Sequence, residues 1–345
     1  MSTHPDFEGL YRDVIPSVVS VYVGGRRRPG GAGSAFVYDD HHLVTNEHVS
    51  RLADASKSNR VELRFADGSW RVGDVVGSDV YTDLAVVAVD DVPADATPLR
   101  LATENPSPGR PVAALGNPLG LEGSISAGIV SGANRSLHTS NGFAIPDVVQ
   151  TDAPINPGNS GGPLVGFVGD TDDGPPYEVV GVNRAKQGDN IGFAVSPVIA
   201  NRILPDLVAD GHYRHSYLRT RTLDVTPSVA EANGLDTPRG ILVVGTASGP
   251  DSTDILRGCS GTTRLRGWEI PVGGDVIVAI EGNEVRTHEE LMRYLITETR
   301  PGEPVAIDVL RDGAPATLVV ELDERPSGDR DRDTRGGGGS RIPIE

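Results

Sequence analysis

Cysteine is nearly absent from this chain of 345 residues, in which Cys259 is the only one. A single thiol allows no intrachain disulfide, no CxxC motif and no Cys/His metal cluster. None of the eight histidines has acidic or cysteine neighbours at metal-ligand spacing, so we predict no metal and no cofactor. Folding must therefore depend on the burial of apolar side chains.

Lysine is almost as scarce, since Lys57 and Lys186 are the only two. The chain has 31 basic and 48 acidic residues, a formal net charge of -17 and a pI of about 4.8. Such a surface repels a polyanionic backbone, so nucleic-acid binding is disfavoured. Acidity with little lysine resembles the composition of proteins adapted to high salt, where counterions screen the self-repulsion.

Long apolar runs are also missing. No segment approaches the ~18 consecutive apolar residues that span a membrane, so we predict no membrane span. Residues 1–14 carry acidic side chains where a signal peptide has a basic start and an apolar core. We therefore expect a cytoplasmic location.

What the sequence does contain is a glycine-rich segment around one serine, residues 152–164 (DAPINPGNSGGPL). Ser160 has Gly158 and Asn159 before it and two glycines after it. This backbone can turn sharply and direct successive N–H groups at one point. We interpret Gly158, Asn159 and Ser160 as an oxyanion hole, with the amides of Gly158 and Ser160 as donors. Taken alone, the segment would favour a simple turn.

A serine nucleophile needs a base, and the base needs an acid that orients it. Two upstream segments supply them: His48 lies in LVTNEHV and Asp83 in TDLAVV, each at the edge of a strand-like apolar run. The order His, Asp, Ser is that of chymotrypsin-like enzymes. We predict a catalytic triad of His48, Asp83 and Ser160. Glu47 would face away from His48 on a strand, and receives no role.

The sequence resembles the HtrA (Deg) family of serine proteases. The matching blocks are collinear and cover residues 16–23, 33–38, 43–49, 83–87, 114–132, 148–165, 179–183 and 190–195. The resemblance implies a mainly β fold, in which a chymotrypsin-like double six-stranded antiparallel β-barrel precedes an α+β PDZ domain. It also implies a homotrimer, with Phe7 and Tyr11 as candidate interface residues.

Local signals predict where elements turn, start and stop. We expect hairpin turns at Asp67-Gly68 and Asp312-Gly313. A helix is expected to be capped by Ser196 and to stop at Gly211.

The C-terminal part carries two further signals. Thr287 and Glu290 predict a capping box at the start of a helix. Residues 248–271 are expected to form an unusually long loop.

Composition and turn signals divide the chain further. Short β-branched runs before residue 101 predict a closed barrel, and the Pro-rich residues 104–111 a crossing to a second one. The expected parts are an N-terminal helix that could serve oligomerisation (1–16), a protease domain (17–197), a linker helix (198–214), a PDZ domain (215–323) and a disordered tail (324–345).

By the same resemblance, the primary substrate pocket is lined by Ile191, Gly192, Phe193 and Ala194. These residues are apolar, so small to medium aliphatic side chains are expected at the cleavage site. The chain departs from its relatives at Arg184, Ala185 and Lys186, where they carry apolar residues, so the activation loop could be set differently.

The PDZ carboxylate-binding loop corresponds to Tyr217, Leu218, Arg219 and Thr220. A PDZ domain binds a peptide C-terminus as an added strand, although this one could also be a structural cap. Relatives usually have glycine in place of Arg219, which puts the amide geometry in doubt, while an arginine could itself pair with a carboxylate.

The sequence therefore predicts an ATP-independent serine endopeptidase that degrades unfolded or damaged polypeptides and recognises C-terminal peptides. No GxxxxGK[ST] loop supports an ATP-driven protease. Two alternatives stay open: a PDZ-bearing chaperone with latent or weak protease activity, and a processing protease with a single substrate.

The charge pattern makes a first prediction. If counterions screen the repulsion among acidic side chains, the melting temperature should rise between ~0.1 M and molar KCl, as the Debye length shrinks from about 10 to about 3 Å. Thermal unfolding over a KCl series measures this. A melting temperature independent of KCl contradicts adaptation to salt.

Overall fold

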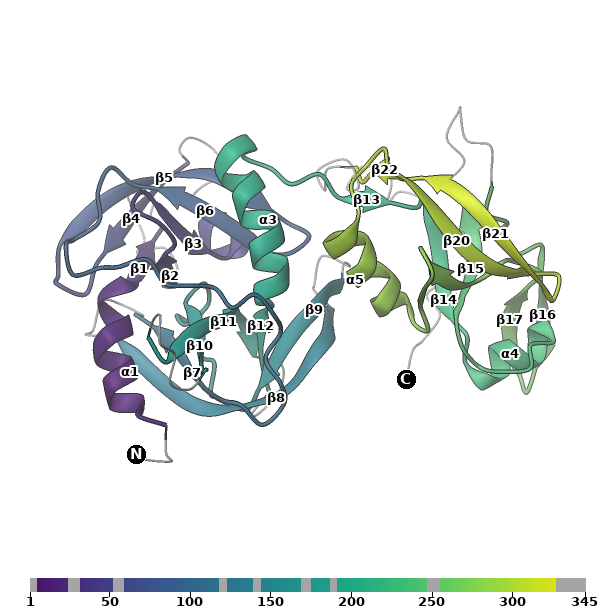
Figure 1. Ribbon diagram of the computed structural model, residues 1–345, viewed down its shortest axis with the longest axis horizontal. Helices are drawn as coiled ribbons and strands as arrows, with labels where there is room; N and C mark the ends of the chain where they lie inside the picture. The colour runs from purple at the N-terminus through teal and green to yellow at the C-terminus, as the bar shows by residue number, and fades with distance from the viewer. Residues whose placement is uncertain are drawn as a thin grey trace. The chain divides into compact units, whose positions relative to one another are not determined.

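The computed structural model describes residues 5–23, 32–51, 59–117, 123–138, 144–168, 175–186, 191–246 and 255–326. The chain forms two compact units, residues 1–213 and 214–345, each described by itself below (Figure 1). The predicted disordered tail lies outside the described residues except for 324–326. Within the described part, no helix is long and apolar enough to cross a membrane.

The first unit begins with a closed six-stranded barrel in the order β1-β2-β3-β6-β5-β4. Its strands are β1 (Val18–Tyr22), β2 (Ala32–Val37), β3 (His42–Thr45), β4 (Arg60–Arg64), β5 (Trp70–Asp79) and β6 (Leu84–Ala88). The β4–β5 hairpin turns at the predicted Asp67-Gly68, where Gly68 has φ 83° and Asp67 Oδ1 accepts the N–H of Ser69.

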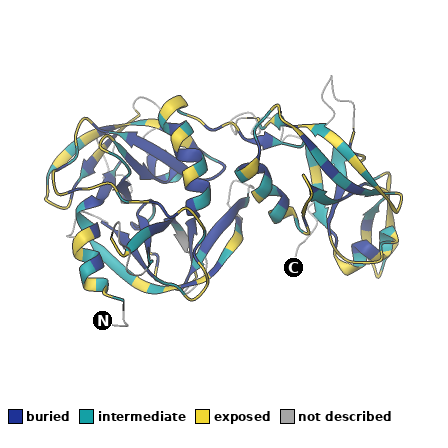
Figure 2. Cartoon of the chain, viewed as in Figure 1, coloured by how far each residue is buried: buried dark blue, intermediate teal, exposed yellow. Residues whose placement is uncertain are grey.

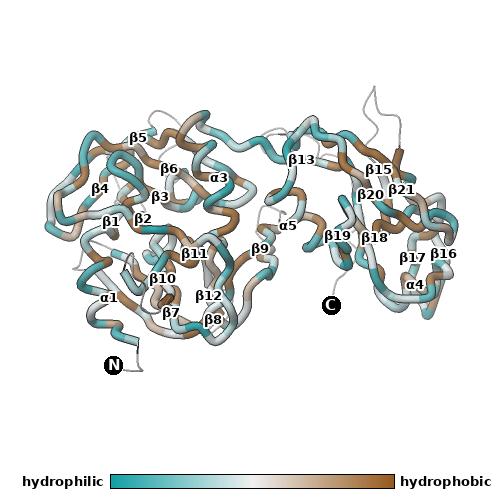
Figure 3. Tube along the Cα trace, viewed as in Figure 1, coloured by the Kyte–Doolittle hydropathy of each residue, from teal (hydrophilic) through white to brown (hydrophobic). Residues whose placement is uncertain are grey.

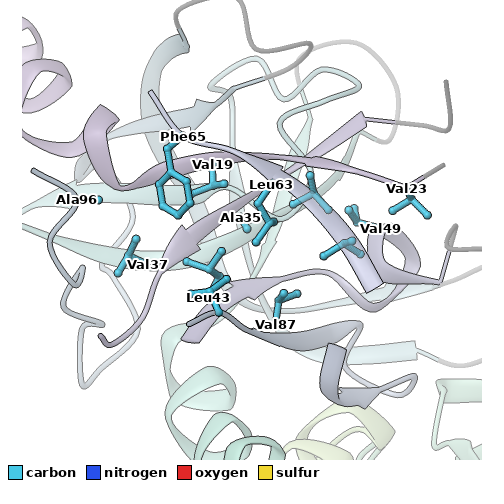
Figure 4. Close-up of a cluster of buried hydrophobic side chains, with 13 residues drawn as sticks. Val19, Val23, Ala35, Val37, Leu43, Val49, Leu63, Phe65, Val87 and Ala96 are labelled. Atoms are coloured by element: carbon cyan, nitrogen blue, oxygen red, sulfur yellow. The ribbon is translucent and has the colours of Figure 1, made fainter. Parts of the chain in front are cut away.

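Inward-facing valines and leucines fill this barrel, with Phe65 at one end (Figure 4). Strand β4 shows the alternation clearly, because Val61 and Leu63 are buried while Arg60 and Glu62 are exposed. Each such side chain contributes roughly 1.5–3 kcal/mol through burial. With Cys259 as the only cysteine, burial replaces disulfides as the source of stability.

A second closed barrel follows in the order β10-β11-β12-β9-β8-β7. Its strands are β7 (Pro111–Gly116), β8 (Ser124–His138), β9 (Ala144–Thr151), β10 (Pro163–Phe167), β11 (Tyr177–Lys186) and β12 (Gly192–Val195). Both barrels are antiparallel and have buried, apolar inner faces (Figures 2 and 3). The predicted pair of six-stranded barrels is confirmed.

Two helices cover the barrels. Helix α1 (Phe7–Val14), capped by Asp6, buries Leu10 and Val14 and continues into the 3-10 turn η1 (Ile15–Ser17). The ring of Phe7 meets Phe167 of β10 edge-on at 5.2 Å, so this candidate interface residue packs against its own barrel.

Helix α3 (Pro197–Asp210) contacts β5, β6 and β11. It starts and stops at the two predicted residues: Ser196 accepts the N–H of Ile199, and Gly211 adopts the left-handed conformation with φ 78°. Gly77 of β5 lies so close that a Cβ there would come within 2.3 Å of the Leu207 carbonyl oxygen.

The second unit is built on a sheet in the order β14-β15-β18-β20-β21, with β19 paired to β18. Its elements are β13 (Ser216–Tyr217), β14 (Thr220–Asp224), α4 (Pro227–Asn233), β15 (Ile241–Thr246), β16 (Gly261–Leu265), β17 (Trp268–Val272), β18 (Val276–Ile280), β19 (Asn283–Glu284), α5 (His288–Glu298), β20 (Pro304–Arg311), β21 (Ala314–Glu321) and β22 (Asp323–Glu324). The predicted hairpin at Asp312-Gly313 is present, with φ 52° and 77°.

Two details of this unit differ from expectation. The region expected to be an extended loop contains the hairpin β16–β17, which turns at Arg266-Gly267 with positive φ at both residues. The predicted capping box is shifted, because Thr287 caps α5 while the carboxylate of Glu290 accepts the N–H of Arg286 instead of that of Thr287.

Tyr177 links β11 to the segment that carries α1, since its hydroxyl donates to Asp13 Oδ2 at 3.0 Å. Burial, followed by this hydrogen bond, raises the pKa of Tyr177 from 10.0 to about 12. The folded state therefore binds more protons than the unfolded state between these values, and stability falls as pH rises through that window.

For Tyr177→Phe we expect a loss of about 0.5–1.5 kcal/mol at pH 8 and a shallower further loss above pH 10. Urea unfolding at pH 8 and at stepwise higher pH measures both. An alkaline limb as steep as that of the parent protein would show that Tyr177 is not its cause.

Candidate active site

His48 lies in a single helical turn, α2 (Glu47–Ser50), directly after β3. His48 therefore lies just beyond the end of a strand, on one turn of helix. The imidazole Nδ1 is 2.8 Å from Asp83 Oδ2 and 3.0 Å from Oδ1, and the backbone N–H of His48 donates to Oδ1 at 2.9 Å. One carboxylate therefore fixes both the ring and the start of the helix. The opposite ring nitrogen, Nε2, takes no part in these contacts, so it is the nitrogen that can exchange a proton with a serine or a substrate.

Asp83 is buried and has φ 60°, an unusual conformation for a non-glycine residue. The surrounding turn maintains it. Asp79 accepts the hydroxyl of Thr82, and the backbone carbonyl of Asp83 accepts the N–H of Glu47 at 3.1 Å and the amide of Asn46 at 3.0 Å. Asn46 is a supporting residue that the sequence analysis missed, although it lies in the segment identified for His48.

Glu47 contacts Asp83 through its backbone N–H alone among the hydrogen bonds described, and its carboxylate pairs with Arg51 at 3.3 Å. Burial raises the pKa of Glu47, while Arg51 opposes the shift. This geometry is consistent with the absence of a catalytic role.

Ser160 lies on a tight loop before β10, and Ser34 of β2 holds that loop. The N–H of Ser34 donates to the carbonyl of Ser160 at 2.8 Å, and its hydroxyl donates to the carbonyl of Gly158 at 2.6 Å. The same hydroxyl accepts the N–H of Asn117 at 2.9 Å. The buried Ser34 thus ties the loop that carries Ser160 to the first barrel.

The predicted oxyanion residues form a turn at Pro157-Gly158, with φ 102° at Gly158. The N–H of Asn159 closes this turn by donating to the carbonyl of Asn156 at 3.0 Å. That amide is engaged, so the amides of Gly158 and Ser160 are the better candidates for binding an oxyanion. Their role stays a prediction.

Arg184 is a second residue whose position the sequence did not reveal. Its Nε donates to Asp83 Oδ2 at 2.7 Å, and its backbone carbonyl accepts the hydroxyl of Ser160 at 2.7 Å. The sequence analysis flagged Arg184 as a departure from relatives, which was the available signal.

The four predicted pocket residues have different environments. Ile191 is 38% exposed, whereas Phe193 packs with Leu137, Ile145 and Val148, and Ala194 lies in the core of the second barrel. A Cβ on Gly192 would come within 2.9 Å of Ile155. Phe193 and Ala194 thus lie among buried side chains of the second barrel, behind the more exposed Ile191. The part of all four residues in specificity stays a prediction.

In the second unit, Tyr217 ends β13, Thr220 begins β14, and Leu218 and Arg219 connect them. Arg219 has φ 52°, the left-handed backbone that glycine adopts easily. Its guanidinium pairs with Asp323 at 2.6 Å. The side chain is therefore occupied within the protein, while the backbone takes the conformation expected of glycine.

Comparisons with known proteins agree with this geometry. The trypsin-like peptidase domain family matches residues 33–169, and the PDZ domain family matches residues 239–322. A solved structure titled HtrA-type protease AlgW with tripeptide superimposes with a TM-score of 0.73 and 29% identity, covering 94% of this chain and 99% of that one. The chain therefore combines a trypsin-like peptidase domain with a PDZ domain, and it is similar over most of its length to HtrA-type proteases.

Curated HtrA relatives are similar along most of this chain. A probable periplasmic serine endoprotease DegP-like from Rhizobium meliloti is 32% identical over 310 residues, which are 88% of this chain and 55% of the relative. The putative serine protease HhoB from Synechocystis is 32% identical over 304 residues, which are 85% of this chain and 66% of that protein. The chain thus spans between about half and two thirds of their length.

These names also correct one expectation. Relatives from Rhizobium meliloti, Bartonella henselae and Marinomonas are named as probable periplasmic endoproteases. The expected cytoplasmic location is therefore wrong. That expectation rested on the composition of residues 1–14 alone. It took no account of the protease and PDZ domains, which are what this chain shares with those relatives.

Ser34→Ala tests whether the hydrogen bonds that hold the loop of Ser160 affect stability and activity. Loss of the hydroxyl leaves the Gly158 carbonyl and the Asn117 N–H unpaired, which should cost about 1–3 kcal/mol of stability. Displacement of Ser160 should also lower kcat by about tenfold to a hundredfold. Urea unfolding and peptide hydrolysis measure the two effects.

Ser17→Ala is the matched control, because the hydroxyl of Ser17 makes an equivalent pair of bonds to the backbone of Thr97, at 2.6 and 2.9 Å. We expect a similar loss of stability with kcat retained. Equal losses of kcat in both variants would mean that destabilisation alone explains the effect of Ser34.

Proposed function

We propose that this protein is an ATP-independent serine endopeptidase that hydrolyses peptide bonds in unfolded or damaged polypeptides. The observation that carries the proposal is the pairing of the His48 imidazole with the buried Asp83 carboxylate at 2.8 Å, beside a serine on a glycine-rich turn. The similarity of the chain to HtrA-type and DegP-like proteases supports it.

The roles follow from this arrangement. His48 Nε2 takes the proton of Ser160 as the serine Oγ bonds to the substrate carbonyl carbon, and the amides of Gly158 and Ser160 bind the resulting oxyanion. The imidazolium then gives the proton to the leaving amine as the peptide C–N bond breaks. Water, activated by the same imidazole, hydrolyses the acyl-enzyme. Asp83 keeps the proton on Nδ1 and stabilises the imidazolium.

For specificity, we propose that Ile191 and Gly192 line the primary pocket, backed by Phe193 and Ala194. An apolar wall favours small to medium aliphatic side chains at the cleavage site.

For the second unit, we propose binding of peptide C-termini along β14, with the carboxylate held by backbone amides of residues 217–220. Two observations support this: β14 is the last strand on its side of the sheet, and Thr222 Oγ1 and His288 Nδ1 lie 2.8 Å apart, joining β14 to α5. An exposed strand edge beside a helix suits an added strand. The solved relative AlgW is titled with a bound tripeptide.

Assembly and location complete the proposal. We propose a homotrimer that works outside the cytoplasmic membrane, in line with the family and with the periplasmic names of relatives. Phe7, which packs against Phe167, and the partly exposed Tyr11 stay the candidates for contacts between protomers.

Hydrolysis of casein in molar KCl by the full chain and by Ser160→Ala tests the activity. We expect the variant to lose more than about a thousandfold in turnover while still binding casein. The exposed Ser107 provides the control, since Ser107→Ala should leave turnover unchanged. Equal turnover by the parent and Ser160→Ala would exclude this nucleophile, and casein binding without cleavage by either would favour a client-binding protein.

A further inference from the structure

Arg184 occupies a bulge in the strand that runs past the candidate active site. On either side of it, Asn183 pairs with Ala194 and Ala185 pairs with Phe193, so Arg184 is the extra residue of β11 opposite β12. A β-bulge interrupts the ladder and re-aims the residue it contains. Both the side chain and the carbonyl of Arg184 are therefore available for contacts outside the sheet.

The two contacts that Arg184 makes reach two members of the proposed triad. The carbonyl oxygen accepts the hydroxyl of Ser160 at 2.7 Å, and the guanidinium donates to the Asp83 carboxylate at 2.7 Å. A serine hydroxyl has only one proton to donate. While that proton points at Arg184, it is not directed at the imidazole of His48.

The guanidinium also changes the electrostatics of the carboxylate. Asp83 Oδ2 lies 2.8 Å from His48 Nδ1 and 2.7 Å from Arg184 Nε, and the side chains of Asp83 and Arg184 are only 5% and 16% exposed. In such a poorly solvated place, charge interactions are strong. The positive charge of Arg184 offsets the charge of Asp83 and disfavours the imidazolium that must form when His48 takes the proton of Ser160.

We propose that Arg184 is a positioning residue that restrains the nucleophile. Its ion pair with Asp83 anchors the bulge so that the carbonyl holds the hydroxyl of Ser160, and its charge weakens the Asp83–His48 couple. Acylation is faster when this ion pair is broken. The inference rests on the proposed serine-protease function, because it concerns the reactivity of the same serine.

The test measures the second-order rate at which a small alkyl fluorophosphonate inactivates the full chain. This reagent phosphonylates the serine oxygen with loss of fluoride, and it needs neither a peptide nor the PDZ domain. For Arg184→Met we expect a rate about three- to tenfold above that of the parent protein, as a barrier lowered by about 1 kcal/mol would give. Arg184→Gln, which keeps a donor but loses the charge, should also react faster.

Two comparisons separate charge from simple loosening of the fold. Arg184→Lys retains the charge with a shorter reach, so its rate should lie between those of the parent and Arg184→Met. Arg71→Met removes an arginine of the first barrel that pairs with Asp91 at 2.9 Å, an ion pair that includes no residue of the proposed triad. Its rate should match that of the parent. Thermal unfolding of each variant verifies that it is folded.

The outcomes are distinct. Labelling of the parent at Ser160 with equal or slower labelling of folded Arg184→Met and Arg184→Gln overturns the inference and leaves the proposed function standing. The same holds if Arg184→Lys reacts as fast as Arg184→Met. If neither the parent nor any variant at position 184 is labelled, the proposed function and the inference both fail.

Discussion

The position of Ser160, the proposed nucleophile, depends on the two glycines that follow it. At both positions the neighbouring chain segments lie so close that there is no space for a side chain. A Cβ on Gly161 would lie 2.1 Å from the carbonyl oxygen of Ser34, and one on Gly162 would lie 2.3 Å from that of Leu115. Ser34 belongs to the first barrel and Leu115 to the second. The loop that bears Ser160 is therefore fixed between the barrels, which allows a triad shared by both to keep one geometry.

The parts that sequence predicted well are those governed by local stereochemistry. Asp67-Gly68 and Asp312-Gly313 form hairpin turns because such pairs accept positive φ, and Ser196 caps α3 because its hydroxyl replaces a missing helical carbonyl. The glycine-rich segment around Ser160 was recognisable for the same reason. In each case, the residues that decide the structure are neighbours in the chain.

The parts that sequence did not predict depend on pairings between distant segments. The hydroxyl of Ser34 bonds to Gly158, 124 residues away, and the guanidinium of Arg184 bonds to Asp83, 101 residues away. Neither residue type indicates such a partner by itself. His48 lies at the end of a strand, but the helical turn α2 that carries it was not predicted, and the carboxylate of Asp83 holds the start of that turn.

The demands on Asp83 show why folding and reactivity compete in this site. A buried carboxylate is costly unless it is paired, and Arg184, the imidazole and the N–H of His48 all satisfy it. In the proposed mechanism, catalysis depends most on that negative charge whenever His48 becomes an imidazolium. A permanent cation on the same oxygen stabilises the resting carboxylate but leaves less of its charge for the imidazolium. The arginine that makes this buried acid tolerable thus also limits how reactive the serine can be.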